Sequence, residues 1–149
     1  MLTPFSSEAN LFWIEKGVFV FPFLVTQKAK EQAMAINYDN KFFVSVKNTA
    51  NGEVCGDTVF HYWQHDGVVW ATYTGGSIRW GTLIATVSAN GDLDMRYHHI
   101  NTVGELMTGE CRSKPEVLAD GRIRLHEAWQ WTSGDRSKGN SIVEEMKEG

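Results

Sequence analysis

The sequence predicts an all-β protein, a single antiparallel up-and-down barrel of about eight strands. Four Asn-Gly or Asp-Gly dipeptides divide the chain, at Asn51-Gly52, Asp66-Gly67, Asn90-Gly91 and Asp120-Gly121. Each lies between segments rich in β-branched and aromatic residues, which is the strongest short-range signal for a hairpin. No useful helical period follows Met34, and consecutive hairpins close most simply into a barrel because closure removes exposed strand edges.

Turn signals place the strands one after another along the chain. We expect them at residues 41–48, 53–64, 68–74, 77–88, 93–101, 106–117, 122–132 and 140–147. Gly75-Gly76 supplies a further turn between the third and fourth strands. At the Asn-Gly and Asp-Gly positions we expect two-residue type I′ turns, since these residues tolerate a positive φ at both central positions.

Such turns also predict which side chains share a face, because the residues that flank a two-residue turn pair directly. The hairpins around residues 66–67, 75–76 and 90–91 agree on one largely apolar face, which we assign to the interior. Its members are Phe60, Tyr62, Gln64, Val69, Ala71, Tyr73, Ile78, Trp80, Thr82, Ile84, Met95, Tyr97 and His99. On the outer face, Trp63 pairs with Trp70, and Trp70 lies opposite Gly81, where an aromatic ring would cover a strand glycine. A partner surface is the alternative for these two indoles.

For the hairpin of residues 106–132, the sequence does not decide which face is interior. Pairing about Asp120-Gly121 places Arg112, Glu127 and Trp129 on one face. If that face is interior, Arg112 and Glu127 form either a structural salt bridge or a site that orients a ligand. The alternative is a bulge at Pro115 that turns Arg112 outward.

Composition narrows the function classes. The chain has 14 basic and 18 acidic residues and a formal charge of −4, which argues against nucleic-acid binding. Cys55 and Cys111 lie far apart without metal-binding spacing, and they fit buried, reduced thiols in a cytoplasmic protein. The five histidines show no metal-ligand spacing, so an inward His99 is better explained as a hydrogen-bonded core residue. No nucleophilic motif is present.

The first 33 residues differ from the rest. Residues 11–25 are apolar, but Glu15, Lys16 and Pro22 interrupt them, and the stretch is too short to span a membrane. Lys30-Glu31 can be encoded by a ribosome-binding sequence at a suitable distance before Met34. We therefore expect residues 1–33 to be an extension that is not part of the native domain, and residues 34–149 to be the barrel. An additional strand and a targeting peptide are the alternatives.

Three motifs carry a family resemblance: Tyr-x-Gly-Gly-x-Ile-Arg-x-Gly at 73–81, Gly-Glu-Leu-Met-Thr-Gly at 104–109 and Trp-Gln-Trp-Thr-Ser-Gly at 129–134. With them, roughly residues 37–146 resemble a family of small bacterial proteins. Its members often carry the label N-acetylglutamate synthase, which implies acyltransferase activity. Acetyltransferases of that kind have an α/β fold with a Gly-rich acetyl-CoA loop between a strand and a helix, and this sequence predicts neither.

The predicted architecture is also similar to the calycin group, which includes lipocalins and fatty-acid-binding proteins. That resemblance implies a ligand inside the barrel. The Gly-x-Trp signature near the first calycin strand is missing here, so no family site residues are carried over.

We therefore expect a small-molecule-binding barrel with an aromatic-lined interior and without a cofactor, a metal, a nucleic-acid partner or a membrane partner. The candidate ligand-binding residues are Tyr62, Tyr97, His99, Arg112, Glu127 and Trp129. Tyr and Trp suit an aromatic or amphipathic ligand, and Arg112 would anchor an acidic group through a bidentate contact. An acyltransferase-type enzyme and a structural or interaction protein with a filled barrel are the alternatives, and a homodimer is compatible with each.

A chain that starts at Met34 is expected to unfold at the same temperature as the full chain, because the hairpin pattern begins after that residue. Thermal unfolding followed by circular dichroism checks this. A midpoint lower by more than about 5 °C, on the order of 1–2 kcal/mol, would show that residues 1–33 contribute to the fold.

Overall fold

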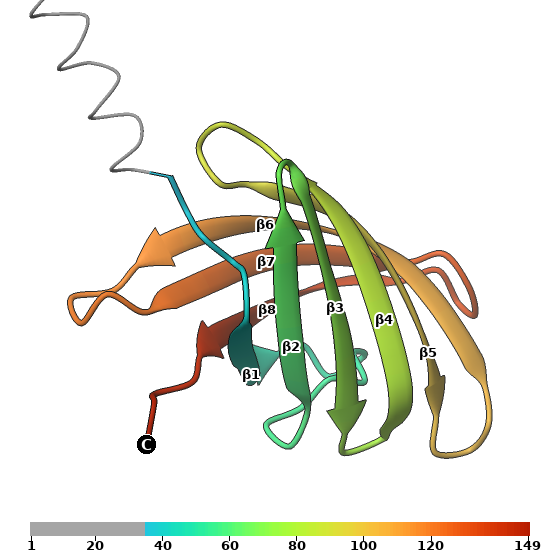
Figure 1. Cartoon of the computed structure of the whole chain (residues 1–149). Coiled ribbons are helices and arrows are strands. Elements are labelled where there is room, and N and C mark those ends of the chain that lie inside the picture. The colour runs from blue at the N-terminus through green and yellow to red at the C-terminus, as the bar shows by residue number, and fades with distance from the viewer. Residues whose placement is uncertain (1–34) are drawn as a thin grey trace, which may run out of the picture. The chain divides into compact units, whose positions relative to one another are not determined.

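A computed structural model describes residues 35–149, which form a closed barrel of eight antiparallel strands (Figure 1). The strands are β1 (Lys41–Asn48), β2 (Val59–His65), β3 (Val68–Gly75), β4 (Ile78–Val87), β5 (Leu93–Asn101), β6 (Leu106–Val117), β7 (Ile123–Trp131) and β8 (Lys138–Glu145). Each strand pairs with the next one, and β8 pairs with β1. The predicted fold class is confirmed, while the proposed extension of residues 1–33 lies outside the described residues. Within the described part, no helix is long and apolar enough to cross a membrane.

Connections alternate between the two ends of an up-and-down barrel. The β1–β2 end carries the loops of residues 49–58, 76–77, 102–105 and 132–137, and the β2–β3 end carries those of residues 66–67, 88–92 and 118–122. The first connection differs from the prediction, because Asn51-Gly52 lies within the long loop of residues 49–58 and β2 begins only at Val59. Residues 53–58, predicted as strand, are therefore available to cover the barrel end.

The β2–β3 end is closed by the segment that precedes β1. Tyr38 is fully buried there, and its hydroxyl donates a 2.6 Å hydrogen bond to the carbonyl oxygen of Gly91. Phe43, Leu93 and Leu125 fill the adjoining part of the interior. Open space inside the barrel is therefore confined to the opposite end.

The turns at Gly91 and Gly121 are not the two-residue turns that the sequence predicts. The Gly91 amide donates to the Ser88 carbonyl at 3.0 Å, and the Ser88 amide donates to the Asp92 carbonyl at 2.9 Å. Gly91 and Gly121 have φ of 91° and 90°. Each connection is thus a type I turn followed by a glycine in the left-handed region, which adds a bulge and shifts the pairing by one residue. At Asp66-Gly67 the two-residue loop is confirmed, since His65 pairs directly with Val68.

A separate register shift decides which face of β4 is interior. The β3–β4 ladder is also irregular between Tyr73 and Gly75, so Tyr73 pairs with Gly81 and not with Ile78. A one-residue slip moves every side chain of a strand to the other face. Leu83 is consequently buried, whereas Trp80 and Ile84, predicted to be interior, are 56% and 58% exposed.

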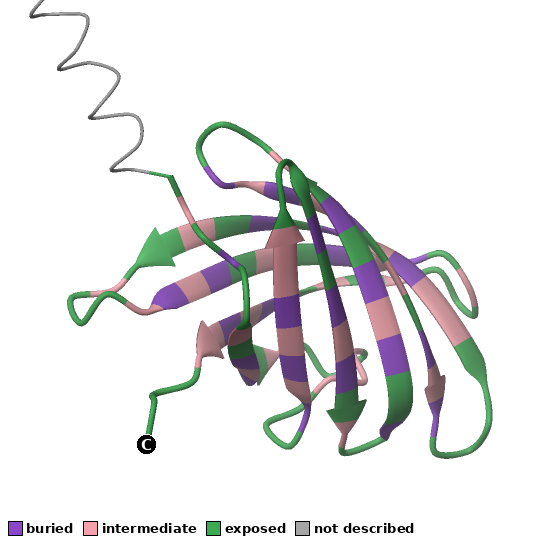
Figure 2. Cartoon of the chain, in the orientation of Figure 1, coloured by how far each residue is buried: buried purple, intermediate pink, exposed green. Residues whose placement is uncertain are grey.

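On β5 the register shift at Gly91 reverses the change of face that the β3–β4 irregularity causes. Met95, Tyr97 and His99 therefore face inward, as predicted, and Figure 2 shows the resulting alternation of buried and exposed residues along the strands. The partner of Tyr73 differs from the prediction by three positions and that of Ile84 by one, and because both numbers are odd the two errors cancel on this strand.

On β6 the same kind of shift turns Arg112 outward. Its side chain is 78% exposed and lies 3.4 Å from the Asp94 carboxylate. The expectation that Arg112 enters the barrel is wrong, and Ser113 takes the position opposite Glu127. The cause is the turn at Gly121 and not a bulge at Pro115, because the β6–β7 register is continuous through Pro115.

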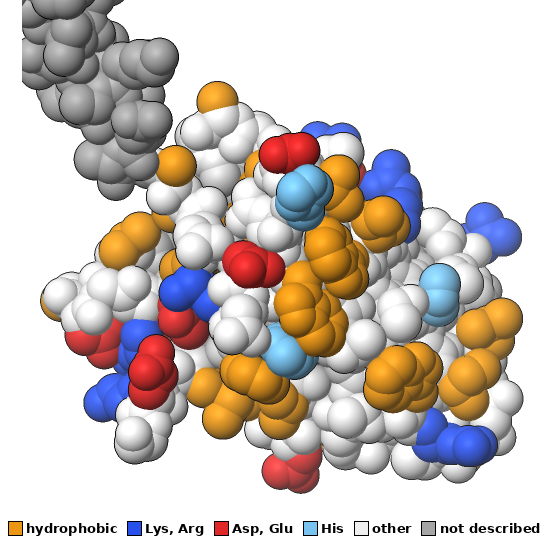
Figure 3. Space-filling model, viewed as in Figure 1, with side chains coloured by type: hydrophobic (Ala, Val, Ile, Leu, Met, Phe, Trp, Pro, Cys, Tyr) orange, Lys and Arg blue, Asp and Glu red, His pale blue; other side chains and the backbone are white. Residues whose placement is uncertain are grey.

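The outer face carries an apolar stripe over β2, β3 and β4 (Figure 3). Trp63 pairs with Trp70 as predicted, but Trp70 lies opposite Ile84 and not opposite Gly81. The ring that covers Gly81 is therefore not the one that the sequence predicts.

Instead, three interior aromatic rings lie against glycines on the neighbouring strand. Tyr73 pairs with Gly81, Tyr97 with Gly109 and Trp129 with Gly139. A Cβ atom at any of these glycines would collide with the opposing ring. The glycines therefore let the rings lie close to the barrel wall.

Leu83→Ala is expected to destabilise the fold by about 2–5 kcal/mol, because it leaves a cavity in the core. Trp80→Ala is expected to cost clearly less, since the larger part of that indole is already in water. Urea unfolding of the two variants checks this, and a larger loss for Trp80→Ala would contradict the register.

Candidate functional site

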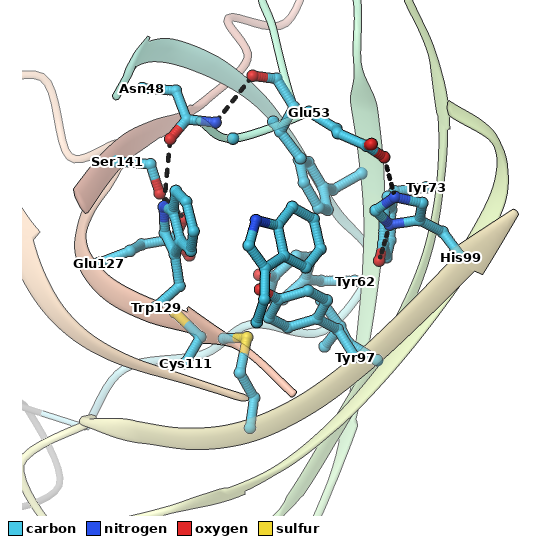
Figure 4. Close-up of a pocket in the computed structure, with 16 residues that line it drawn as sticks. Asn48, Glu53, Tyr62, Tyr73, Tyr97, His99, Cys111, Glu127, Trp129 and Ser141 are labelled. Carbon is cyan, nitrogen blue, oxygen red and sulfur yellow. Dashed lines mark hydrogen bonds and ion pairs between the residues drawn. The ribbon is translucent and has the colours of Figure 1, made fainter. Parts of the chain in front are cut away.

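A cavity of about 50 Å³ opens at the β1–β2 end of the barrel (Figure 4). That volume has room for roughly four water molecules. Its aromatic lining consists of Phe60, Tyr62, Tyr73, Tyr97, Trp129 and Trp131, and its polar lining includes Asn48, Glu53, His99, Glu127 and Ser141. An apolar pocket with few polar groups is typical of small-molecule sites.

Most of the candidate residues meet in this pocket. Tyr62 comes from β2, Tyr97 and His99 from β5, and Glu127 and Trp129 from β7. Arg112, the sixth candidate, lies on the outside and does not line the pocket.

Sequence reasoning missed several lining residues. Glu53 lies in the loop of residues 49–58, which was predicted as strand, so no pattern pointed it toward the interior. Cys111 and Ser141 were hidden by the unknown register of the last three strands. Trp131 could have been found, because it lies two positions after Trp129 on the same face of β7.

The Glu127 carboxylate is held by two hydroxyl groups from the flanking strands. Ser141 donates to it at 2.7 Å from β8, and Ser113 donates at 3.2 Å from β6. Burial raises the pKa of Glu127 above its ordinary value, while the two hydrogen bonds act in the opposite direction and offset only part of that effect. Glu127 makes no ion pair with any residue from 35 to 149.

His99 links β5 to the loop of residues 49–58. Its Nε2 lies 2.7 Å from the Glu53 carboxylate, and its Nδ1 lies 3.0 Å from the Tyr73 hydroxyl. Asn101 donates to the same Glu53 carboxylate at 3.2 Å. Both ring nitrogens of His99 therefore have partners in the protein. Across residues 35–149, no group of three or more His, Cys, Asp or Glu side chains could hold a metal ion.

Two indole groups hold the same loop over the pocket. Trp129 Nε1 donates to the Asn48 side-chain oxygen at 3.1 Å, and Trp131 Nε1 donates to the Asn51 carbonyl at 3.1 Å. Asn48 in turn donates to the Val54 carbonyl at 2.9 Å. The rings are thus oriented by their N–H groups, while their apolar surfaces remain available to the cavity.

The two cysteines differ in their surroundings. Cys111 lines the pocket, and burial raises the pKa of its thiol well above the ordinary value, which disfavours a reactive thiolate. Cys55 is exposed in the loop of residues 49–58, so the expectation that both thiols are buried is wrong for Cys55.

One buried hydroxyl in the pocket has no hydrogen-bond partner among residues 35–149. Tyr62 is 1% exposed, and its hydroxyl makes no hydrogen bond within the described range. Burial, and then the nearby Glu127 carboxylate, raise the pKa of Tyr62 well above its ordinary value. The phenol therefore stays protonated and is free to donate to a bound molecule.

Comparison with known proteins gives one match. The model of a family described as Avidin-like protein matches residues 36–146. No curated protein and no solved structure matches the chain.

Glu127→Gln is expected to stabilise the fold near neutral pH. The pKa of Glu127 is higher in the folded state than in the unfolded chain. Below about pH 4 the carboxyl is protonated in both states and does not destabilise the fold. As the pH rises through the raised pKa, the folded protein must ionise a buried carboxyl, and this lowers its stability. Thermal unfolding at about pH 4 and pH 8 checks this. The midpoint of the variant should rise relative to that of the wild type only at the higher pH. The same difference at both pH values would contradict this account.

Proposed function

The chain belongs to the avidin-like protein family, and from that premise we propose that it binds a small molecule in the pocket at the β1–β2 end. The avidin-like family binds small molecules such as biotin. For this chain, the ligand would lie among Tyr62, Tyr97, His99, Glu127 and Trp129.

The aromatic-lined cavity carries this proposal. Apolar surface accounts for most of its lining, and the few polar groups converge from β2, β5, β7 and β8. Such a site gains affinity from apolar contact and orientation from a small number of hydrogen bonds. Because Tyr38 closes the opposite end, a ligand would enter past the loop of residues 49–58.

The cavity's size limits the ligand or the part of it that is enclosed. About 50 Å³ accommodates a compact group, with the rest of an amphipathic or aromatic molecule extending toward the open end. The expectation of an acidic ligand depended on Arg112, and it loses its basis because that guanidinium lies outside the barrel.

Binding is supported better than catalysis. The one interior thiol, Cys111, is buried beside Ser113 at 3.6 Å and has no histidine among its hydrogen-bond partners in residues 35–149. An acyltransferase reaction therefore has no specific observation in its favour.

Native mass spectrometry of the freshly purified protein, followed by titration of a small-molecule panel that includes biotin, tests the proposal. Intrinsic tryptophan fluorescence should report saturable binding, because Trp129 and Trp131 line the cavity. Trp129→Phe should weaken binding by about tenfold, since it removes part of the contact surface and the hydrogen bond to Asn48.

Trp80→Phe is the matched control, because it makes the same change to an exposed indole on the outer face. It should leave the affinity unchanged. Equal weakening by both variants, or the absence of any co-purified or added ligand, would overturn the proposal and favour a structural role.

A further inference from the structure

The pocket contains two carboxylates, Glu53 beside His99 and Glu127 without a basic partner among residues 35–149. Within residues 35–149 the Glu127 carboxylate is held by two serine hydroxyls, and Glu53 contacts His99 and Asn101. None of the lining residues is Lys or Arg. A buried carboxylate without a counter-charge is costly, and a bound cation would offset that cost.

On the outer surface, by contrast, several carboxylates are paired with arginine. Asp94 contacts Arg96 at 2.8 Å, and Glu116 contacts Arg124 at 3.4 Å. The pocket is therefore distinguished from the surface by the absence of Lys and Arg from its lining.

Hydrogen-bond donors inside the pocket are mostly occupied. The two indole N–H groups bind Asn48 and the Asn51 carbonyl, and the Tyr73 hydroxyl lies against His99. The hydroxyls of Tyr62 and Tyr97 remain, since neither makes a hydrogen bond within residues 35–149. An anionic group would thus meet two carboxylates and few free donors.

The aromatic rings present their surfaces to the cavity. Tyr73, Tyr97 and Trp129 rest against glycines of the barrel wall and line the cavity. Trp131 completes the lining, with its ring centre 5.9 Å from that of Tyr97 and 5.5 Å from that of Trp129. Figure 4 shows Glu127 near Trp129 on one side of the pocket and the Glu53–His99 pair on the other. Aromatic faces carry negative electrostatic potential and attract cations.

We propose that the pocket binds the head group of a small organic cation, such as a quaternary ammonium. The aromatic faces surround the apolar surface of the head group, and the Glu127 carboxylate supplies the opposite charge. This inference rests on the proposed function and specifies the ligand class of the same site.

The test compares three molecules of nearly the same shape that differ in charge. Choline is the cation, 3,3-dimethylbutan-1-ol is the neutral analogue with carbon in place of nitrogen, and 3,3-dimethylbutanoate is an anion. Isothermal titration calorimetry and tryptophan fluorescence with the full chain give the affinities. Choline is expected to bind about tenfold more tightly than the alcohol, and the anion should bind least.

Two variants separate the effect of charge from that of shape. Glu127→Gln removes the charge at nearly constant volume, so it should weaken choline by about tenfold and change the alcohol by less than about twofold. Glu53→Gln, at the rim, is the second variant and should weaken choline to a smaller extent. Glu116→Gln on the outer surface is the matched control and should change neither affinity, with thermal unfolding used to confirm that every variant is folded.

The outcomes distinguish this inference from the function on which it rests. If the alcohol binds as tightly as choline, or if Glu127→Gln weakens both ligands equally, the cation class is wrong while small-molecule binding stands. If none of the three molecules binds but another molecule occupies the pocket, the cation class is again overturned. If nothing binds, both proposals fail.

Discussion

The constraint on which the rest of this structure depends is the two-residue alternation of side chains in a closed barrel. Because neighbouring strands must stay paired around the whole circle, the length of each turn fixes which side chains point inward. Here Gly91 and Gly121 adopt left-handed conformations that each add one residue to a turn. The Gly121 turn places Arg112 outside the pocket, and the irregular β3–β4 ladder places Leu83 in the core and Trp80 on the surface.

The barrel is divided along its axis into a filled half and a hollow half. Tyr38 and the side chains around it occupy the β2–β3 end, where they behave as an ordinary apolar core. At the β1–β2 end, large rings lie against the wall because glycines stand opposite them, so the centre stays open. The loop of residues 49–58 is fixed over this opening by hydrogen bonds from Trp131 and Asn48 and by the contact of Glu53 with His99. The same strands therefore form a packed core at the β2–β3 end and a pocket covered by a loop at the β1–β2 end.

Electrostatics gives the hollow half its chemical character. Basic side chains such as Arg112 and Arg96 remain on the outside, where they pair with surface carboxylates in water. Glu127 remains inside, beside two serine hydroxyls and among aromatic rings. The same register that removed Arg112 from the interior thus left a carboxylate without a counter-charge there, which is why an acid-binding pocket is no longer the natural interpretation.

The sequence by itself determined the number and antiparallel order of the strands, the closed barrel and the inward direction of Tyr62, because alternating apolar residues and Gly-containing turns are local signals. Tertiary structure alone decided the face of β4, the outward position of Arg112 and the place of Glu53 over the pocket. A type I′ turn and a type I turn with a bulge can use the same Asn-Gly or Asp-Gly dipeptide, and they differ by one residue in register. That difference is settled by which arrangement buries the apolar face of both strands in the closed barrel, and no local pattern contains this information.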